Sequence, residues 1–224
     1  MPNPNLRPEV GKNKEIGLNL RYDDIFQKGD SFRGKFNLFR NDVEDYIELT
    51  GTGVFSGPPV NSFNFYQYQN IESARLEGFE FETMYDAGSW FAGLSGQTIT
   101  GKNMVTGIGL VSTPADKIST TAGVRLLDHK LTVAMRWTAF DALTDLPANY
   151  LPTDAYDLVN LYVGYAPHPD VLASFSIDNI LDEYYLPYPV PRSSATDAQW
   201  DGLWASRGPG ITYKAGLQIR FAAM

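Results

Sequence analysis

The chain has 224 residues, a formal net charge of −8 and no cysteine, which excludes disulfides, thiolate nucleophiles and cysteine metal sites. The acidic balance argues against a nucleic-acid partner, and two histidines, His129 and His168, are too few to predict a cluster of imidazole metal ligands. Twenty Gly, 13 Tyr and 13 Phe without helical periodicity favour β structure.

An alternation of apolar and polar residues with period two is the dominant pattern along the chain, and it predicts β-strands. In the closing stretch, Ile211, Tyr213 and every second residue up to Phe221 share one face, while Thr212 begins the opposite face. We expect about nine such segments, each close to the length that a tilted strand needs to cross a bilayer. The clearest, in chain order, are residues 15–22, 79–85, 118–126, 131–140, 171–177 and 211–221.

The connections between these strands alternate between short and long. This sorting puts all tight turns at one end of the sheet and all long loops at the other, which is typical of outer-membrane barrels. His129 and His168 then fall in tight turns, opposite to the long loops. The short connections are residues 25–31, 86–88, 128–130 and 167–170, and the long ones are 50–64, 101–116, 141–154 and 182–210.

The two faces of each strand fit a membrane barrel, in which the apolar face meets lipid and the polar face lines the lumen. Aromatic residues near strand ends, among them Tyr22, Trp90, Trp137 and Phe221, fit an interfacial girdle. Alternation alone also fits a soluble acidic β-sandwich that acts as a binding module. If the barrel interpretation is correct, the following charged residues face the lumen: Glu80, Glu82, Arg125, Arg136, Asp178 and Arg220.

Five short motifs are spread over almost the whole chain: residues 3–9 (NPNLRPE), 67–80 (containing ARLEGFE), 101–114 (containing GKN and TG), 178–185 (DNILDEYY) and 207–210 (RGPG). Together and in this order, they resemble the C-terminal part of a TonB-dependent outer-membrane receptor, and most of all its heme or hemoglobin branch. The resemblance implies an all-β fold, an antiparallel meander of about nine long strands from a transmembrane barrel of about 22 strands.

From the same resemblance, we expect residues 1–224 to form one partial barrel domain that lacks the plug domain and the N-terminal strands. Open sheet edges cost free energy in lipid, so we expect a fragment, a truncated reading frame or one piece of a split receptor. The resemblance implies that the barrel-assembly machinery recognises the last strand, which ends on the aromatic residue Phe221. Three further residues, Ala222, Ala223 and Met224, follow Phe221.

The implied function is uptake of heme, or of iron from heme proteins, across the outer membrane of a Gram-negative-type cell. The ligand would bind at long extracellular loops, and the TonB complex would deliver energy through the plug. Heme is then a transported ligand, and no covalently bound cofactor is expected. The remaining implied partner is outer-membrane lipid.

Two segments supply the candidate ligand contacts. Residues 3–6 either meet heme or hemoglobin or form a Pro-containing turn that leads into a strand. In the last long loop, phenols and a guanidinium could contact a porphyrin and its propionates, although loop aromatics are equally expected in an interfacial girdle. The full set is Asn3, Pro4, Asn5, Leu6, Tyr184, Tyr185, Tyr188 and Arg192.

We expect no enzyme and assign no metal site, because no nucleophile with its base and no metal-ligand spacing stand out from the sequence. Carboxylates in a long loop, such as Asp141, Asp145 and Asp154, could bind calcium. Within the receptor class, a siderophore or other iron-chelate receptor is the alternative. The alternative from another class is the soluble β-sandwich binding module, which would stay in solution without detergent.

Overall fold

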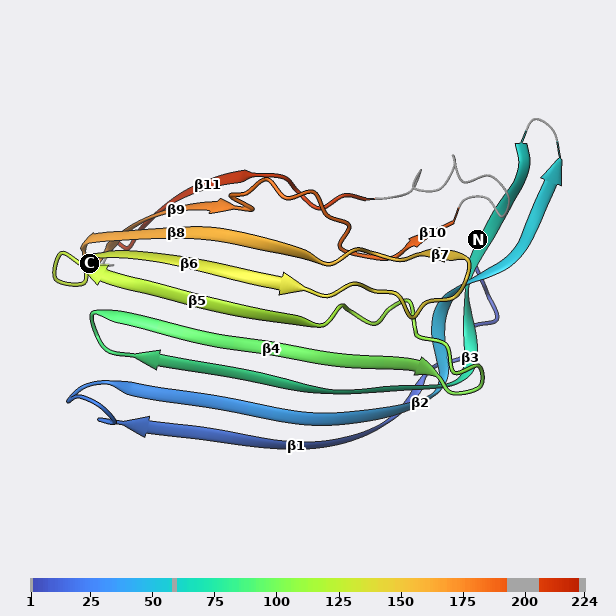
Figure 1. Ribbon diagram of the computed structural model, residues 1–224, viewed down its shortest axis with the longest axis horizontal. Helices are drawn as coiled ribbons and strands as arrows, with labels where there is room; N and C mark the ends of the chain where they lie inside the picture. Colours follow the sequence, from blue (N-terminus) through green and yellow to red (C-terminus); the bar gives the residue numbers. More distant parts are fainter. Residues whose placement is uncertain (1, 58–59, 193–205, 222–224) are drawn as a thin grey trace.

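The computed structural model describes residues 2–57, 60–192 and 206–221. Nine strands form one antiparallel sheet in the order β1-β2-β3-β4-β5-β6-β8-β9-β11, and the short strands β7 and β10 pair beside it (Figure 1). The prediction of an all-β meander of about nine strands is therefore confirmed. The bounds are β1 Val10–Asp23, β2 Ser31–Gly57, β3 Val60–Asp86, β4 Trp90–Asn103, β5 Lys117–Leu126, β6 Leu131–Phe140, β7 Tyr150–Leu151, β8 Tyr156–His168, β9 Val171–Asp178, β10 Val190–Pro191 and β11 Thr212–Ile219.

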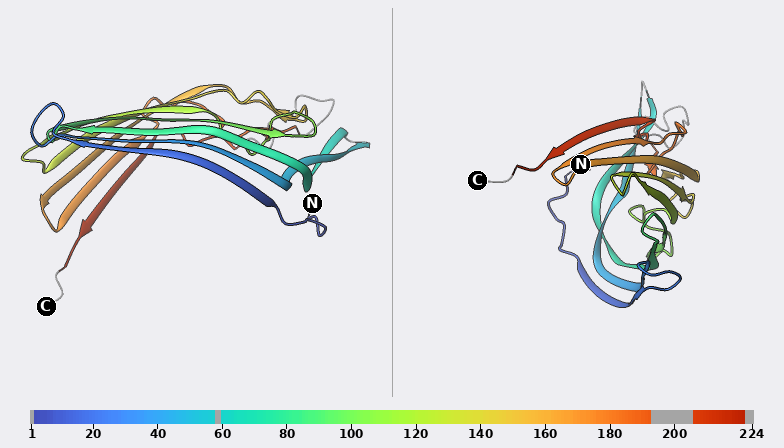
Figure 2. Two further views of the ribbon diagram at one scale, coloured as in Figure 1. Left: turned by 90° about the horizontal axis from the view of Figure 1, so that it is seen from below. Right: turned by 90° about the vertical axis from the view of Figure 1, so that its left-hand side faces the viewer.

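The sheet is curved and open, with one concave and one convex face (Figure 2). Its edges are β1 and β11, and within the described residues neither edge pairs with a further strand. We call the end that carries the connections after β1, β3, β5 and β8 the turn end, and the end where β4, β6 and β9 finish the loop end. No helix in the described part of the chain is long and apolar enough to cross a membrane.

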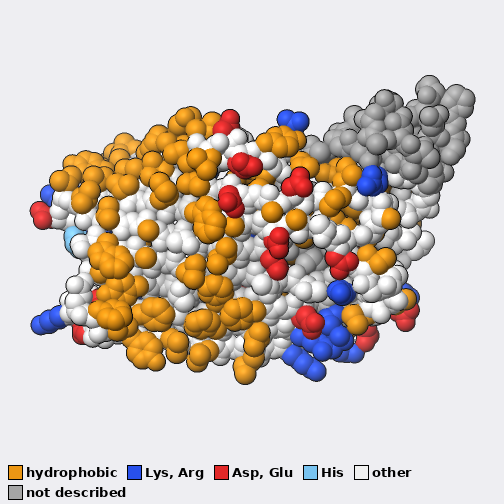
Figure 3. Space-filling model, in the orientation of Figure 1, with side chains coloured by type: hydrophobic (Ala, Val, Ile, Leu, Met, Phe, Trp, Pro, Cys, Tyr) orange, Lys and Arg blue, Asp and Glu red, His pale blue; other side chains and the backbone are white. Residues whose placement is uncertain are grey.

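The convex face is apolar because the strand register brings the apolar residues of neighbouring strands together. Ile16 of β1 lies opposite Leu38 of β2, which lies opposite Phe79 of β3. Several apolar side chains of this face are unusually exposed for their type: Ile16 is 71% exposed and Leu217 of β11 is 67% exposed. Hydrophobic side chains cover most of this face toward the turn end (Figure 3). The sheet thus presents an apolar surface that nothing in the described chain covers.

The turn between β1 and β2 is held by one buried carboxylate. Asp30, 2% exposed, accepts hydrogen bonds from the backbone N–H groups of Ile25, Phe26 and Gln27 at 2.7, 2.9 and 3.0 Å. The hydroxyl of Tyr85 donates to the same carboxylate at 2.7 Å. Although burial opposes the charged form, these four donors lower the pKa of Asp30 to about 2. The turn end is therefore built around a fixed negative charge.

The prediction of a long loop at residues 50–64 is wrong. β2 and β3 continue through this segment, each 27 residues long, and pair out to Gly57 opposite Val60. The hairpin projects beyond the loop end of the sheet (Figure 1). The register shifts between Gly51 and Gly53, and such a bulge moves later side chains to the other face. The interrupted alternation explains why the sequence pattern resembles a loop.

Two smaller boundaries also differ from the predictions. β4 extends to Asn103, so the connection predicted from residue 101 begins later. His168 ends β8 instead of lying in the turn, and its Nδ1 is 3.4 Å from a carboxylate oxygen of Asp170. His129 does lie in a turn, with a backbone φ of 67°. Both histidines are at the turn end, as expected.

Candidate functional site

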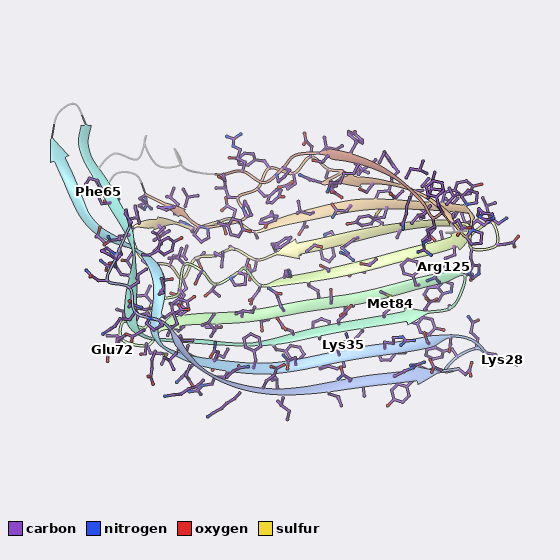
Figure 4. The ribbon with its side chains drawn as sticks, turned by 180° about the vertical axis from the view of Figure 1, so that it is seen from behind. Lys28, Lys35, Phe65, Glu72, Met84 and Arg125 are labelled. Carbon is purple, nitrogen blue, oxygen red and sulfur yellow. The ribbon has the colours of Figure 1, made fainter. Side chains whose placement is uncertain are left out.

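The concave face of the sheet is polar. Lys35 of β2, labelled in Figure 4, lies opposite Glu82 of β3, which lies opposite Ser95 of β4. The next row toward the loop end places Asn37 beside Glu80. A hollow on this face is lined by residues of four adjacent strands, among them Lys35, Asn37, Glu80, Glu82, Gln97 and Lys117. The register thus confirms that Glu80 and Glu82 share the polar face.

Further charged residues predicted for the lumen also lie on the polar face. At the turn end, Arg125 of β5 forms a bidentate pair with Asp86 at 2.7 and 2.8 Å and donates to the carbonyl oxygen of Gly88. Across the sheet, Arg136 of β6 hydrogen-bonds Thr121 and Asp178 of β9 pairs with the ammonium of Lys214.

At the loop end, the projecting part of the β2–β3 hairpin acts as a scaffold for the connection between β4 and β5. The carboxylate of Glu48 accepts the N–H of Val111 at 2.6 Å, and the hydroxyls of Tyr46 and Ser112 are 2.6 Å apart. Glu48 is only 7% exposed, and burial raises its pKa although the backbone of Val111 and Ser112 acts in the opposite direction.

The connections after β6 and β9 dock on the same hairpin. The hydroxyl of Tyr150, a residue 4% exposed, donates to the carbonyl oxygen of Leu49 at 2.7 Å. The hydroxyl of Tyr66 lies 2.6 Å from the carbonyl oxygen of Asn149 and 2.9 Å from that of Arg192. A groove between hairpin and loop is lined by residues 48–53, Asn64, Pro147, Asn149 and Tyr150. Three connections therefore converge on one hairpin at the loop end.

The segment of residues 3–6 lies against this hairpin. The amide of Asn3 donates to the carbonyl oxygen of Tyr68 at 2.9 Å, and its Oδ1 accepts the N–H of Asn5 at 3.0 Å. Pro4 and Asn5 form a turn whose side chains are exposed, and Leu6 is 37% exposed. The structure supports the turn interpretation of this segment and leaves its contact with a ligand as a prediction.

The aromatic residues of the last loop fall into separate environments. Tyr185 stacks on Tyr156 with ring centroids 4.6 Å apart, and Tyr156 stacks on Phe140 at the same distance. Tyr184 is 58% exposed, with the guanidinium of Arg207 4.3 Å from its ring centroid. Tyr188 is 73% exposed.

Arg192 joins β3 and the β6–β8 connection through its backbone. Its N–H donates to Asn149 at 2.8 Å, and its carbonyl oxygen accepts from the amide of Asn64. Arg192 and residues 3–6 thus share the hairpin, whereas Tyr184 and Tyr185 lie near β8 and Arg207.

The sequence patterns do not point to the residues that join the hairpin to the loops. These are Glu48 and Tyr66 of the hairpin, and Asn149 and Tyr150 of the connection after β6. The signal for a longer strand was present, because Tyr66 and Tyr68 alternate with Gln67 and Gln69. The buried carboxylate of Glu48 carries no comparable signal, since its burial depends on a loop more than sixty residues away.

Comparison with known proteins agrees with this architecture. The family model of the TonB-dependent receptor-like β-barrel matches residues 1–180. The chain is 34% identical over 204 residues to heme/hemopexin utilization protein C of Haemophilus influenzae (strain ATCC 51907 / DSM 11121 / KW20 / Rd), covering 83% of this chain and 28% of that protein. It is 28% identical over 200 residues to the hemin receptor of Yersinia enterocolitica, covering 86% of this chain and 29% of that protein.

Among solved structures, the copper transporter OprC aligns with a TM-score of 0.73 at 17% identity, over 96% of this chain and 32% of that chain. At that identity the likeness concerns the fold alone. The chain spans less than a third of the length of these curated relatives. The match over residues 1–180, the nine-stranded open sheet and the two contrasting faces lead to one assignment. The chain belongs to the family of TonB-dependent receptor-like β-barrels.

Proposed function

We propose that this chain is part of an outer-membrane receptor that takes up heme, or iron from heme proteins. The observation that carries the proposal is 34% identity, over 83% of the chain, to a protein named for heme and hemopexin utilization. The relatives named hemin receptor support the same cargo. Siderophore receptors resemble the chain at low identity and support the fold only, so an iron-chelate cargo is the alternative outcome of the test.

In this proposal, residues 1–224 are one partial barrel domain, and further strands complete the barrel at the free edges of β1 and β11. The convex face meets outer-membrane lipid, and the barrel-assembly machinery recognises β11. The polar concave face packs against a plug domain that couples to the TonB complex.

The loop end is the extracellular side in this proposal, and heme arrives there as the transported ligand. The proposed ligand contacts remain Asn3, Pro4, Asn5, Leu6, Tyr184, Tyr185, Tyr188 and Arg192. Tyr188 is the strongest of them, because its phenol is the most exposed of the loop tyrosines. Tyr185 acts through the aromatic stack that it forms with Tyr156. No catalytic role is proposed for any residue.

Hemin titration of the protein, purified in detergent at its full natural length, tests the cargo. We expect a Soret band shift with wild type and weaker binding with Tyr188→Ala. Tyr213→Ala is the matched control, because Tyr213 is an exposed tyrosine of β11 on the convex face. Absence of a Soret shift, together with no growth on hemin as the iron source, would contradict heme uptake. Growth on a ferric siderophore instead would support the alternative.

A further inference from the structure

Basic side chains gather on the convex face where its apolar surface ends toward the loop end (Figure 3). The strand register assigns them to four neighbouring strands, and three carboxylates lie on the same face. We define the basic patch as Lys12, Lys14, Arg40, Arg75 and Lys102; the carboxylates are Asp42, Glu44 and Glu77. The patch is net positive on a chain whose total charge is −8.

Two cations of the patch occupy directly opposed positions. Lys14 of β1 lies opposite Arg40 of β2 in the antiparallel register, and like charges in such a pair repel each other. Arg40 Nε is 3.1 Å from Asp42, but the same carboxylate also serves Arg75 Nε at 2.7 Å. No ion pair within the described residues includes Lys14. An anion between Lys14 and Arg40 would relieve this repulsion.

The surface next to these two cations is apolar. Ile16 follows Lys14 on the same face of β1, and Leu38 precedes Arg40 on the same face of β2. Ile16 and Leu38 are 71% and 55% exposed, and Leu18, the next residue along, is 55% exposed. A ligand that fits both parts has an anionic head and apolar chains running toward the turn end.

We propose that the basic patch binds the phosphate groups of a phosphorylated glycolipid in the membrane leaflet at the loop end. Phosphate oxygens accept charge-assisted hydrogen bonds from Lys14 and Arg40, whose planar guanidinium suits phosphate geometry. The acyl chains lie along Ile16, Leu18 and Leu38. The inference rests on the proposed function in one respect, that the convex face meets lipid, and it does not depend on the cargo.

The test uses the protein at its full natural length, purified in detergent and stripped of lipid. Binding of lipid A carrying two phosphates is measured by native mass spectrometry, with dephosphorylated lipid A and inorganic phosphate as separate probes. For Lys14→Gln/Arg40→Gln we expect the dissociation constant of the phosphorylated lipid to rise by about 30-fold. Arg33→Gln/Lys35→Gln removes two cations from the concave face of the same sheet and should bind like wild type.

Equal binding by Lys14→Gln/Arg40→Gln and wild type would overturn the proposal, as would equal binding of dephosphorylated lipid A. Displacement of the lipid by inorganic phosphate would assign the patch to a free anion and would also contradict the proposal.

Thermal unfolding in lipid-free detergent shows whether a change in lipid binding comes from a change in folding. The Lys14→Gln/Arg40→Gln variant should unfold close to the wild-type temperature, because the loss of a like-charge repulsion offsets the loss of the exposed Arg40–Asp42 ion pair. This variant should bind hemin as wild type does. A failure of the heme assignment would therefore appear in the hemin titration and not in the lipid measurement.

Discussion

Asn179 and Glu183 hydrogen-bond to each other in both directions. Nδ2 of Asn179 donates to the carbonyl oxygen of Glu183 at 2.9 Å, and the N–H of Glu183 donates to Oδ1 of Asn179 at 2.8 Å. Nδ2 of Asn179 also donates to the carbonyl oxygen of Pro209 at 3.1 Å, and its backbone N–H donates to Oδ1 of Asn160 at 2.8 Å. One side chain, 3% exposed, therefore connects the end of β9 with the segment before β11. This geometry gives the DNILDEYY motif a structural role.

Replacing Asn179 by Ala should lower the free energy of unfolding by about 2–4 kcal/mol, because it leaves buried backbone groups without partners. The backbone of Asn179 also has a φ of 50°, which Asn tolerates better than Ala. Denaturant unfolding in detergent measures the change. Asn19→Ala, at an exposed position of β1, is the control and should stay close to wild type. Equal stability of both variants would contradict this role for Asn179.

The turn that surrounds Asp30 should lose stability in acid. Its folded pKa, about 2, lies below the ordinary value, so the stabilisation is present above pH of about 4 and is lost as the pH falls toward 2. Asp30→Asn should be less stable than wild type at neutral pH and should lack this acid dependence. Thermal unfolding between pH 2 and 7, with Asp128→Asn in another turn as control, measures both effects. An unchanged acid dependence in Asp30→Asn would show that other groups cause it.

The stability of the loop that docks on Glu48 should change with pH in the direction opposite to that of the Asp30 turn. Burial raises the folded pKa of Glu48, so stability is highest below the ordinary glutamate pKa and falls as the pH rises through the raised value. Glu48→Gln should remove this dependence while its amide oxygen still accepts the N–H of Val111. Glu72→Gln, an exposed residue on β3, is the control. Identical pH profiles for Glu48→Gln and wild type would argue against the buried charge as the cause.

Gly208 should tolerate no side chain, because a Cβ there would overlap the ring of Tyr185. Gly208→Ala is expected to lower the free energy of unfolding by about 1–3 kcal/mol, the typical cost of overpacking, and to move Tyr185 off Tyr156. Gly53→Ala is the matched control, since a Cβ at that position meets nothing within 4 Å. Near-ultraviolet circular dichroism reports the aromatic stack. An unchanged spectrum would mean that the ring adapts without leaving Tyr156.

Neighbouring residues of β1 test which face meets lipid. Leu18 belongs to the convex face and Asn19 to the concave one. Leu18→Lys should reduce the free energy of unfolding in lipid vesicles by about 2–4 kcal/mol, whereas Asn19→Lys should have little effect. A soluble β-sandwich predicts no dependence on vesicles. Folding of both variants without any lipid or detergent would therefore contradict the membrane assignment.

Much of the fold follows from the sequence because its signals are local. Period-two alternation in residues such as 131–140 and 211–221 locates the strands and their two faces, and short polar segments locate the turns. The sheet order then follows, because strands that are consecutive in the sequence usually lie next to each other in the sheet.

The tertiary structure decided what holds the loop end together. Glu48 meets Val111, Leu49 meets Tyr150, and Asn64 meets Arg192 across 63, 101 and 128 residues of sequence. No local periodicity encodes such pairs, and the bulge near Gly51 hides the hairpin on which they converge. The sequence by itself determined strands, faces and family resemblance, since these depend on neighbours along the chain. The length of the β2–β3 hairpin and the docking of three connections on it depend on contacts that exist only once the chain is folded.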